Sequence, residues 1–456
     1  MSQPGKGTKG TSSPPVRLRE SHADRWLAPA RQLMHMDAAS GVVLLLATVV
    51  AIYLANSQWS FEYANIWKTK LAFQIGDYVD RGHTLNDFIN DGLMTIFFFV
   101  VGLEIKRELV LGELRDPRKA LLPIVAAAGG MLVPAGIYYA LHRGLPSQEG
   151  WAIPMATDIA FVVGVISLFG ARVPFGLKIM LLTLAIVDDL GAVLVIALVF
   201  NSDLAWQWLA VSGGGLLVAI LFNLIGVRRV GIYVLIGLVV WFGFFKGGIH
   251  PTLAGVLLGL LTPSKAWLGD EHVAEAMAAV RTGGGGGTGG AGPDRESHAR
   301  TRRIEFAIRE SISPLHRLEL ALHPWVSFLI MPLFALANAG VTLDFSSLGH
   351  PVAIGVALGL LVGKPLGVFL FSFLTIQVGA TKLPTGVTWR LLLGGAFLAG
   401  IGFTMALFLN GLSFATVPRY EADGKIGVLA GSLASAILGS IILLTAPKPD
   451  AKAAAK

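Results

Sequence analysis

Long apolar runs recur along this chain and are separated by short polar segments. Runs of roughly 17 to 25 apolar residues are long enough for one α-helix to cross a hydrocarbon core about 30 Å thick. The apolar residues are continuous rather than alternating with polar ones, which favours helices over the strands of a membrane β-barrel. The pattern predicts twelve membrane-spanning helices, near residues 38–56, 86–104, 119–142, 151–170, 175–200, 205–226, 230–245, 247–263, 321–338, 351–376, 389–411 and 424–446.

Composition also indicates a protein that crosses a membrane many times. The chain has 456 residues, of which 54% are hydrophobic and only 14% are charged, and its mean hydropathy is +0.66. Soluble proteins of this size are far less apolar. Lys and Arg outside the predicted helices gather on alternate connections, as they do on the cytoplasmic side of membrane proteins. We therefore predict that both termini face the cytoplasm.

Charge and cysteine content exclude two classes of partner. The formal net charge of +7 follows from the basic residues at the cytoplasmic helix ends, so it does not indicate a nucleic-acid interface. The chain has no cysteine, which rules out disulfides and thiolate metal sites. His250 has no companion His at ligand spacing, so we interpret it as a packing residue at a helix end rather than a metal ligand.

Several polar segments lie outside the predicted helices. Residues 1–35 predict a disordered basic tail, and 448–456 a short cytoplasmic tail. The twelve helices occupy 36–447, interrupted at 264–313 by a glycine-rich segment that predicts a flexible cytoplasmic loop. Residues near 67–79 contain β-prone stretches around a glycine, which fit either an external hairpin, whose edge is available to a second copy of the chain, or an interfacial loop.

Four charged residues lie inside predicted helices, namely Asp158, Asp188, Asp189 and Lys364. An ionisable group near the bilayer centre costs about 2.5 to 3.5 kcal/mol on insertion scales, so such groups usually serve ion or proton pathways. Asp188 and Lys364 each lie roughly 20 Å along their helices, and Asp158 roughly 12 Å along its own. Their similar depths favour a single central site, although a static buried salt bridge remains the alternative for Asp188 and Lys364.

Helix-breaking residues precede polar residues in two of the twelve predicted helices, 151–170 and 389–411. Pro154 precedes Thr157 and Asp158 in one, and Gly400-Ile401-Gly402 precedes Thr404 in the other. Both residue types favour interruption of a helix, and membranes tolerate the backbone groups left unpaired there only where the backbone is buried in protein or lines a cavity. Breaks in two separate helices are typical of a transporter site.

The residue types at this depth indicate the chemistry. Carboxylates and freed carbonyls are ligands for a small hard cation. Removal from water also favours the neutral form of a carboxyl group, so the same group can hold either a cation or a proton. This competition is the minimum needed to exchange metal cations for protons. No cofactor is expected besides the transported ions.

Two alternatives use the same residues differently. A proton-coupled carrier of another solute would need a larger pocket, usually with Arg contacts, and no Arg lies inside a predicted helix. An intramembrane aspartyl protease would need a Gly-x-Gly-Asp motif in an apolar helix; the only similar string, Leu268-Gly269-Asp270, falls in the polar loop.

The motifs resemble those of the NhaA family of bacterial sodium/proton antiporters, from about Asp37 to the last predicted helix. The matching segments are Ala156-Thr157-Asp158-Ile159-Ala160-Phe161, Ala185-Ile186-Val187-Asp188-Asp189-Leu190-Gly191-Ala192, Gly363-Lys364-Pro365-Leu366-Gly367, Gly400-Ile401-Gly402-Phe403-Thr404-Met405, Asn90-Asp91, Val101-Gly102-Leu103-Glu104-Ile105-Lys106-Arg107-Glu108 and His323-Pro324-Trp325.

This resemblance implies an all-α fold of twelve helices with inverted-topology repeats, a known feature of the family, and two broken helices that cross at the site. It implies that Asp189 is the principal ligand of transported Na⁺ and the proton acceptor, with Asp188 beside it. Asp158 and Thr157 would adjust the crossing, and Lys364 would pair with Asp188 or carry a proton. The implied activity is electrogenic, pH-regulated exchange of Na⁺ or Li⁺ for protons in the bacterial inner membrane, by a homodimer joined through the external hairpin.

The resemblance also assigns pH sensing and a cytoplasmic funnel to a set of charged residues. They are Glu104, Lys106, Arg107, Glu108, Glu319, His323 and Asp91. One position departs from the family pattern: Leu320 stands where members can carry a His, and Leu does not titrate, so we expect a different pH profile.

Overall fold

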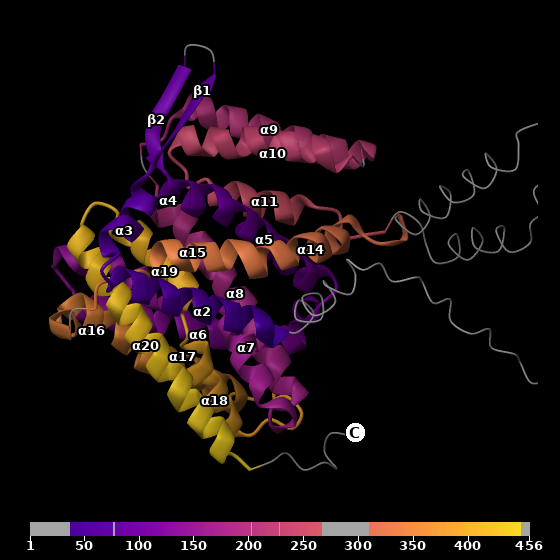
Figure 1. The fold of residues 1–456 in the computed structure, drawn as a ribbon. Coiled ribbons are helices and arrows are strands. Elements are labelled where there is room, and N and C mark those ends of the chain that lie inside the picture. Colours follow the sequence, from indigo (N-terminus) through magenta and orange to yellow (C-terminus); the bar gives the residue numbers. More distant parts are fainter. Residues whose placement is uncertain are drawn as a thin grey trace, which may run out of the picture.

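The computed structural model describes residues 37–75, 78–201, 203–227, 229–266, 310–343 and 345–447. This part of the chain is helical apart from one two-stranded hairpin (Figure 1). The predicted tails 1–35 and 448–456, most of the predicted loop 264–313, and the Leu268-Gly269-Asp270 string lie outside the described residues.

The first half of the chain begins with a helix and a hairpin and continues as packed helices. Its elements are α2 (Asp37–Ala55), α3 (Ser60–Lys68), β1 (Lys70–Ile75), β2 (Tyr78–Thr84), α4 (Leu85–Asp87), the π-helix η1 (Phe88–Leu93), α5 (Met94–Val110), the 3-10 helix η2 (Glu113–Arg115), α6 (Pro117–Leu141), the 3-10 helix η3 (Pro146–Met155), α7 (Ile159–Leu168), the 3-10 helix η4 (Gly170–Arg172) and α8 (Phe175–Val199).

In the second half, helices are the only regular elements among the described residues. Its elements are α9 (Trp206–Ile225), α10 (Val230–Gly247), α11 (Thr252–Leu261), α14 (Pro314–Trp325), the π-helix η5 (Val326–Ile330), α15 (Met331–Asn338), the 3-10 helix η6 (Phe345–Gly349), α16 (Pro351–Leu358), the π-helix η7 (Gly359–Gly363), α17 (Lys364–Gln377), α18 (Trp389–Ala399), α19 (Phe403–Ser413) and α20 (Pro418–Thr445).

Eight helical stretches of the described chain are long and apolar enough to cross a membrane. The number rises to eleven if each of three bent helix pairs counts as one span, and α11 is a further apolar helix of only 10 residues. The chain is therefore a multi-pass membrane protein. Each apolar run of the sequence contains a helix, although twelve complete crossings stay a prediction.

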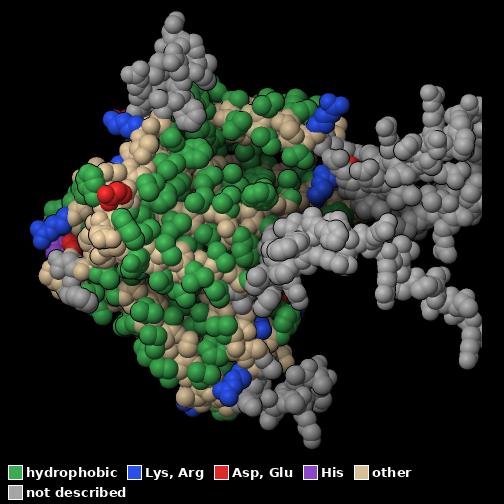
Figure 2. All heavy atoms as spheres, in the orientation of Figure 1, with side chains coloured by type: hydrophobic (Ala, Val, Ile, Leu, Met, Phe, Trp, Pro, Cys, Tyr) green, Lys and Arg blue, Asp and Glu red, His purple; other side chains and the backbone are tan. Residues whose placement is uncertain are grey.

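The outer surface suits a lipid environment. Leu198, Trp206 and Leu224 are 79%, 75% and 80% exposed, and hydrophobic side chains dominate the face in Figure 2, with Lys and Arg mainly near its margins. Apolar side chains at the surface of a soluble protein would favour aggregation, whereas in lipid they need no partner.

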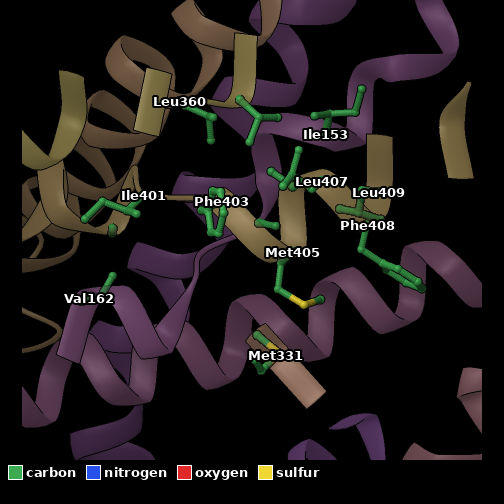
Figure 3. Packing of buried hydrophobic residues seen from close by; sticks show 14 of the residues in the cluster. Ile153, Val162, Met331, Leu360, Ile401, Phe403, Met405, Leu407, Phe408 and Leu409 are labelled. Carbon is green, nitrogen blue, oxygen red and sulfur yellow. The ribbon is translucent and has the colours of Figure 1, made fainter. Parts of the chain in front are cut away.

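Helix α19 contributes many residues to the buried apolar core. Met405, Leu407 and Phe408 of that helix belong to the main cluster of buried apolar residues, and the Met405 side chain extends toward Met331 of α15 (Figure 3). Glycines bring other helices into backbone contact: a Cβ on Gly129 of α6 would lie 2.4 Å from the Gly367 carbonyl oxygen of α17. Small residues at helix contacts are the usual means of close packing in membranes.

The predicted hairpin is present, a few residues later than the 67–79 segment. β1 and β2 are antiparallel, with Lys70 opposite Thr84, and the register shifts between Leu71 and Phe73. Thr84 then begins α4 with a capping box, in which its side chain accepts from the Asp87 backbone N–H while the Asp87 carboxylate accepts from the Thr84 N–H.

Candidate functional site

The first broken helix consists of η3 and α7, whose axes differ by 42°. Pro154 lies in the last turn of η3, and the helix stops at Ala156-Thr157-Asp158, just after this proline. Asp158 restarts the helix as its N-cap, because its Oδ1 accepts the Phe161 backbone N–H at 3.2 Å. The predicted break is therefore a three-residue extended segment.

The second broken helix consists of α18 and α19, which are bent by 43° across Gly400-Ile401-Gly402. A Cβ on Gly400 would lie 2.5 Å from the Leu360 carbonyl oxygen, and one on Gly402 would lie 3.0 Å from the Ala156 carbonyl oxygen. Side chains at these two positions would collide with the neighbouring backbones. The glycines therefore serve close approach as well as interruption.

The two breaks contact each other directly. The Asp158 backbone N–H donates to the Ile401 carbonyl at 2.7 Å. Thr404 donates to Asp158 Oδ2 through its backbone N–H, at 3.0 Å, and through its hydroxyl. Backbone groups released by one break are therefore satisfied by the other, which stabilises both in a medium without water.

Asp188 and Lys364 form an ion pair next to these breaks. Lys364 Nζ lies 2.8 Å from Asp188 Oδ2, and both side chains are fully buried. The amine also donates to the Met155 carbonyl at the end of η3. Lys364 begins α17 directly after the π-helix η7, and its stem passes Gly130 of α6. The predicted pairing of these two residues is thus present in the structure.

Thr157 joins this pair to the second broken helix. Its hydroxyl lies 2.6 Å from Asp188 Oδ2 and 3.0 Å from the Ala399 carbonyl oxygen, at the end of α18. A hydroxyl has one proton to donate, so it can serve only one of these acceptors at a time.

Asp189 is buried and leaves a carboxylate oxygen without a hydrogen-bond partner in the part of the chain that the structure describes. It is 2% exposed, and its Oδ1 has no hydrogen-bond partner among the described residues, as is also true of Asp188 Oδ1. The charges of Asp188, Glu104, Asp158 and Lys364 all act on its carboxyl group. A buried carboxylate oxygen without a donor is costly, so this group is suited to hold a proton or a small cation.

Several supporting groups carried no signal in the sequence. On α20, Ser432 Oγ accepts the Gly402 backbone N–H at 3.2 Å, and Ser435 Oγ donates to the Leu360 carbonyl of η7 at 3.3 Å. Serines are common at helix contacts in membranes, so their spacing alone does not distinguish them. Only the folded arrangement shows that they hold the second break and η7.

The predicted pH-sensing residues are only partly brought together. Arg107 forms an ion pair with Glu319 of α14 and lies 3.8 Å from Glu108. Lys106 instead donates to the Leu260 carbonyl of α11 at 2.7 Å. His323 is exposed, one helical turn after Glu319 on α14, and is not part of this ion pair. Glu104 is affected electrostatically by Arg107, Glu319 and Glu108.

Asp91 lies apart from that cluster, in η1 at the opposite end of the same membrane span as Glu104. Its Oδ1 is 3.7 Å from His250 Nε2, and its backbone carbonyl accepts from the Trp241 indole at 3.0 Å. His250 Nδ1 is 2.7 Å from Thr252 Oγ1 at the start of α11. The interpretation of His250 as a helix-end residue agrees with this position, whereas its pairing with Asp91 was not foreseen.

A family model described as Na⁺/H⁺ antiporter 1 matches residues 31–443. The chain belongs to the Na⁺/H⁺ antiporter 1 family. Among relatives in this family, the Na⁺/H⁺ antiporter NhaA of Rhodopirellula baltica is 48% identical over 437 residues, which are 93% of this chain and 96% of the relative. An NhaA 2 of Acidiphilium cryptum is 46% identical over 433 residues, 95% of each chain.

The NhaA of Rhizobium meliloti is 43% identical over 435 residues, covering 94% of this chain and 98% of its own length. Membership in the Na⁺/H⁺ antiporter 1 family confirms the resemblance seen in the motifs. It also makes the chain a transporter rather than an enzyme, so the aspartyl protease alternative is wrong.

Proposed function

We propose that this protein is an electrogenic antiporter of the bacterial inner membrane that expels Na⁺ or Li⁺ in exchange for protons by alternating access. The observation that carries the proposal is Asp189, a buried carboxyl with an unpartnered oxygen beside the Asp188–Lys364 ion pair. Both groups lie next to the contact of two broken helices. Family membership supports Na⁺ and protons as the transported ions.

Competition at the two aspartates provides the coupling. Asp188 and Asp189 contribute oxygen ligands for a cation, and Asp158, through its bonds to Thr404, keeps the crossing helices in place. A proton on Asp189 removes the charge that attracts the cation, and a bound cation disfavours the proton. Cation and proton therefore occupy the site alternately.

Thr157 connects the charge state of Asp188 to the backbone at the end of α18. While Asp188 is charged, the Thr157 hydroxyl donates to its Oδ2. When Asp188 is neutralised by a proton or a cation, the hydroxyl is released to the Ala399 carbonyl, which lies 3.0 Å away. The charge state of the site thus alters how η3 and α18 are joined, which is the kind of bistable contact that alternating access needs.

Electrogenic exchange follows from the number of titratable groups. Two aspartates and Lys364 together can take up more protons than the single charge carried by Na⁺. Each cycle then moves net charge, and the membrane potential contributes about 2.3 kcal/mol per charge for every 100 mV. A proton-coupled carrier of another solute would use the same groups, but the family gives no support for one.

The remaining architecture is proposed on the same basis. Twelve crossings with cytoplasmic termini would place the breaks in the fourth and eleventh helices, as inverted repeats require. The bends of 42° and 43° are nearly equal, and the two breaks lie in matching positions after α6 and after α16–α17. Regulation by pH would act through Glu104, the Arg107–Glu319 pair and, at the opposite end, Asp91.

The test is cation-induced pH change in everted membrane vesicles. Asp189→Asn should reduce Na⁺- and Li⁺-dependent proton movement to the level of vesicles without the protein, because the amide cannot exchange protons. Asp203→Asn makes the same change at an exposed position between α8 and α9 and should leave exchange intact. Exchange by Asp189→Asn at the parental rate would refute the assignment, and exchange insensitive to membrane potential would refute electrogenicity.

A further inference from the structure

A pocket of about 690 Å³ opens between the end of α5, the start of α6 and α8. Glu108 and Gly112 line one side, and Ile179, Leu182 and Thr183 of α8 line the other. It lies on the side of the molecule where the Arg107–Glu319 ion pair is found, since Arg107 adjoins Glu108. Under the proposed orientation this pocket faces the cytoplasm.

A small apolar cluster lies next to this pocket. Val101, Ile105 and Ile186 are 4%, 1% and 2% exposed and form a small cluster separate from the main core. Leu182, which also lines the pocket, packs against this cluster together with Leu190. The pocket and the apolar cluster are therefore adjacent at Leu182.

Helix geometry places Asp189 behind the cluster. Leu182 and Asp189 are seven residues apart, so they lie on nearly the same face of α8, roughly 10 Å along its axis. Ile186 lies between them. On α5, Ile105 and Glu108 follow Val101 by four and seven residues, so they lie on one face of that helix. An ion that moves from the pocket to Asp189 along this interface must pass Ile105 and Ile186.

The contact between α5 and α8 is made by apolar side chains, so the two helices can move apart without breaking hydrogen bonds between these side chains. On its other side α5 is held by glycines: a Cβ on Gly102 would lie 2.6 Å from the Val256 carbonyl oxygen of α11, and one on Gly255 would lie 2.2 Å from the Thr95 carbonyl oxygen. Toward α8 the same helix presents the apolar side chains of Val101 and Ile105. Apolar constrictions exclude water and hydrated ions until they widen.

We propose that Val101, Ile105 and Ile186 form an apolar gate between the pocket and Asp189, and that separation of α8 from α5 at this gate admits the ion. This inference rests on the proposed exchange function. Glu104 adjoins the gate, and its charge acts both on Asp189 and on the Arg107–Glu319 side. It therefore connects the two sides of the gate electrostatically.

Because the chain has no cysteine, single cysteines report on the gate without background. Ile179→Cys and Ile186→Cys are a matched pair, two isoleucines seven residues apart on one face of α8. In everted vesicles without Na⁺, a membrane-impermeant methanethiosulfonate should label Ile186→Cys at least about tenfold more slowly than Ile179→Cys, which corresponds to 1.4 kcal/mol. Na⁺ with a proton gradient should raise the Ile186→Cys rate, because turnover opens the gate.

Cross-linking tests whether the gate must move. In Ile105→Cys with Ile186→Cys, a short bifunctional thiol reagent should stop exchange, and reduction should restore it. The control is Gly215→Cys with Val240→Cys across α9 and α10, where a Cβ at position 215 would lie 2.7 Å from Val240 Cγ2. Exchange in this control should continue after cross-linking.

Equal labelling rates for Ile179→Cys and Ile186→Cys would contradict the proposed gate, and so would an Ile186→Cys labelling rate that turnover does not change. Full exchange by the cross-linked Ile105→Cys, Ile186→Cys variant would also contradict it. If the double variant is inactive before cross-linking, the labelling result alone decides. If the parent chain shows no exchange, the proposed function fails, but labelling without Na⁺ still shows whether access from the pocket stops at Ile186.

Discussion

At the scale of single residues, the two oxygens of Asp188 have very different surroundings. Oδ2 receives the Lys364 amine and the Thr157 hydroxyl, whereas Oδ1 has no hydrogen-bond partner among the described residues. Together with the free Oδ1 of Asp189, this leaves buried carboxylate oxygens in the site that are available to an ion. The asymmetry lets one aspartate anchor the structure while still offering an oxygen.

Removing only one partner of the Asp188–Lys364 ion pair is expected to lower the stability of the folded protein more than removing both. Lys364→Met leaves Asp188 charged and buried, and removal of one partner of a buried ion pair typically costs about 3 to 5 kcal/mol. The detergent-solubilised variant should therefore lose its monodisperse peak in size-exclusion chromatography at a lower temperature than the parent. Adding Asp188→Asn should recover part of the loss. A double variant no more stable than Lys364→Met alone would contradict this account.

At the scale of elements, the two breaks are built differently. The first is a short extended segment after Pro154, capped by Asp158. The second relies on glycines, and a Cβ on Gly400 would collide with Ser435 and the Leu360 carbonyl. The π-helix η7, which comes just before Lys364, supplies the Leu360 carbonyl that Ser435 binds. Helix irregularities therefore determine where the amine and the breaks meet.

Two glycines close together in the chain should respond oppositely to alanine. In Gly400→Ala the new Cβ would lie 2.4 Å from Ser435 Oγ and 2.5 Å from the Leu360 carbonyl oxygen, so we expect about 1 to 3 kcal/mol of destabilisation and slower exchange. Gly411→Ala on α19 has nothing within 4 Å of the new Cβ and should be neutral or stabilising by up to about 1 kcal/mol. Thermal melts and vesicle exchange measure both, and equal effects would refute the role of crowding at Gly400.

At the scale of the whole molecule, the hairpin of β1 and β2 makes few contacts with the described helices. It projects beyond the helix ends beside α9 and α10 in Figure 1, and one side-chain contact to them is the edge-on packing of His83 on Phe245. An isolated two-stranded hairpin is marginally stable alone, and its outer edges offer unpaired backbone groups. A second copy of the chain can supply the missing strands.

Removing the hairpin should therefore separate the homodimer that the family resemblance implies, without stopping transport. Lys70 and Thr84 are directly paired, so replacing residues 71–83 by two glycines joins them without strain and keeps the Thr84 cap. Light scattering of the detergent-solubilised protein should show a fall from dimer to monomer, with exchange retained in vesicles. An unchanged mass would contradict dimerisation through this hairpin. Loss of exchange would instead indicate that the hairpin supports the transport domain.

The sequence by itself determined the class of the protein and the identity of its central residues. Continuous apolar runs require lipid around them, and the energetic cost of Asp158, Asp188, Asp189 and Lys364 at that depth indicates a functional site. The positions of the breaks could also be predicted, because proline removes a backbone donor and glycine has low helix propensity, and both fall next to the polar residues of the site. The family motifs then identified the ions.

Only the tertiary structure decided how these residues are connected. The roles of Ser432 and Ser435, the two acceptors of Thr157, the approach of Asp91 to His250, and the proposed Ile105–Ile186 gate depend on contacts between helices far apart in the chain. Sequence periodicity shows which face of a helix is apolar but not which helix packs against it. Depth along each helix is a local property, whereas the choice of neighbour depends on the packing of all the helices together.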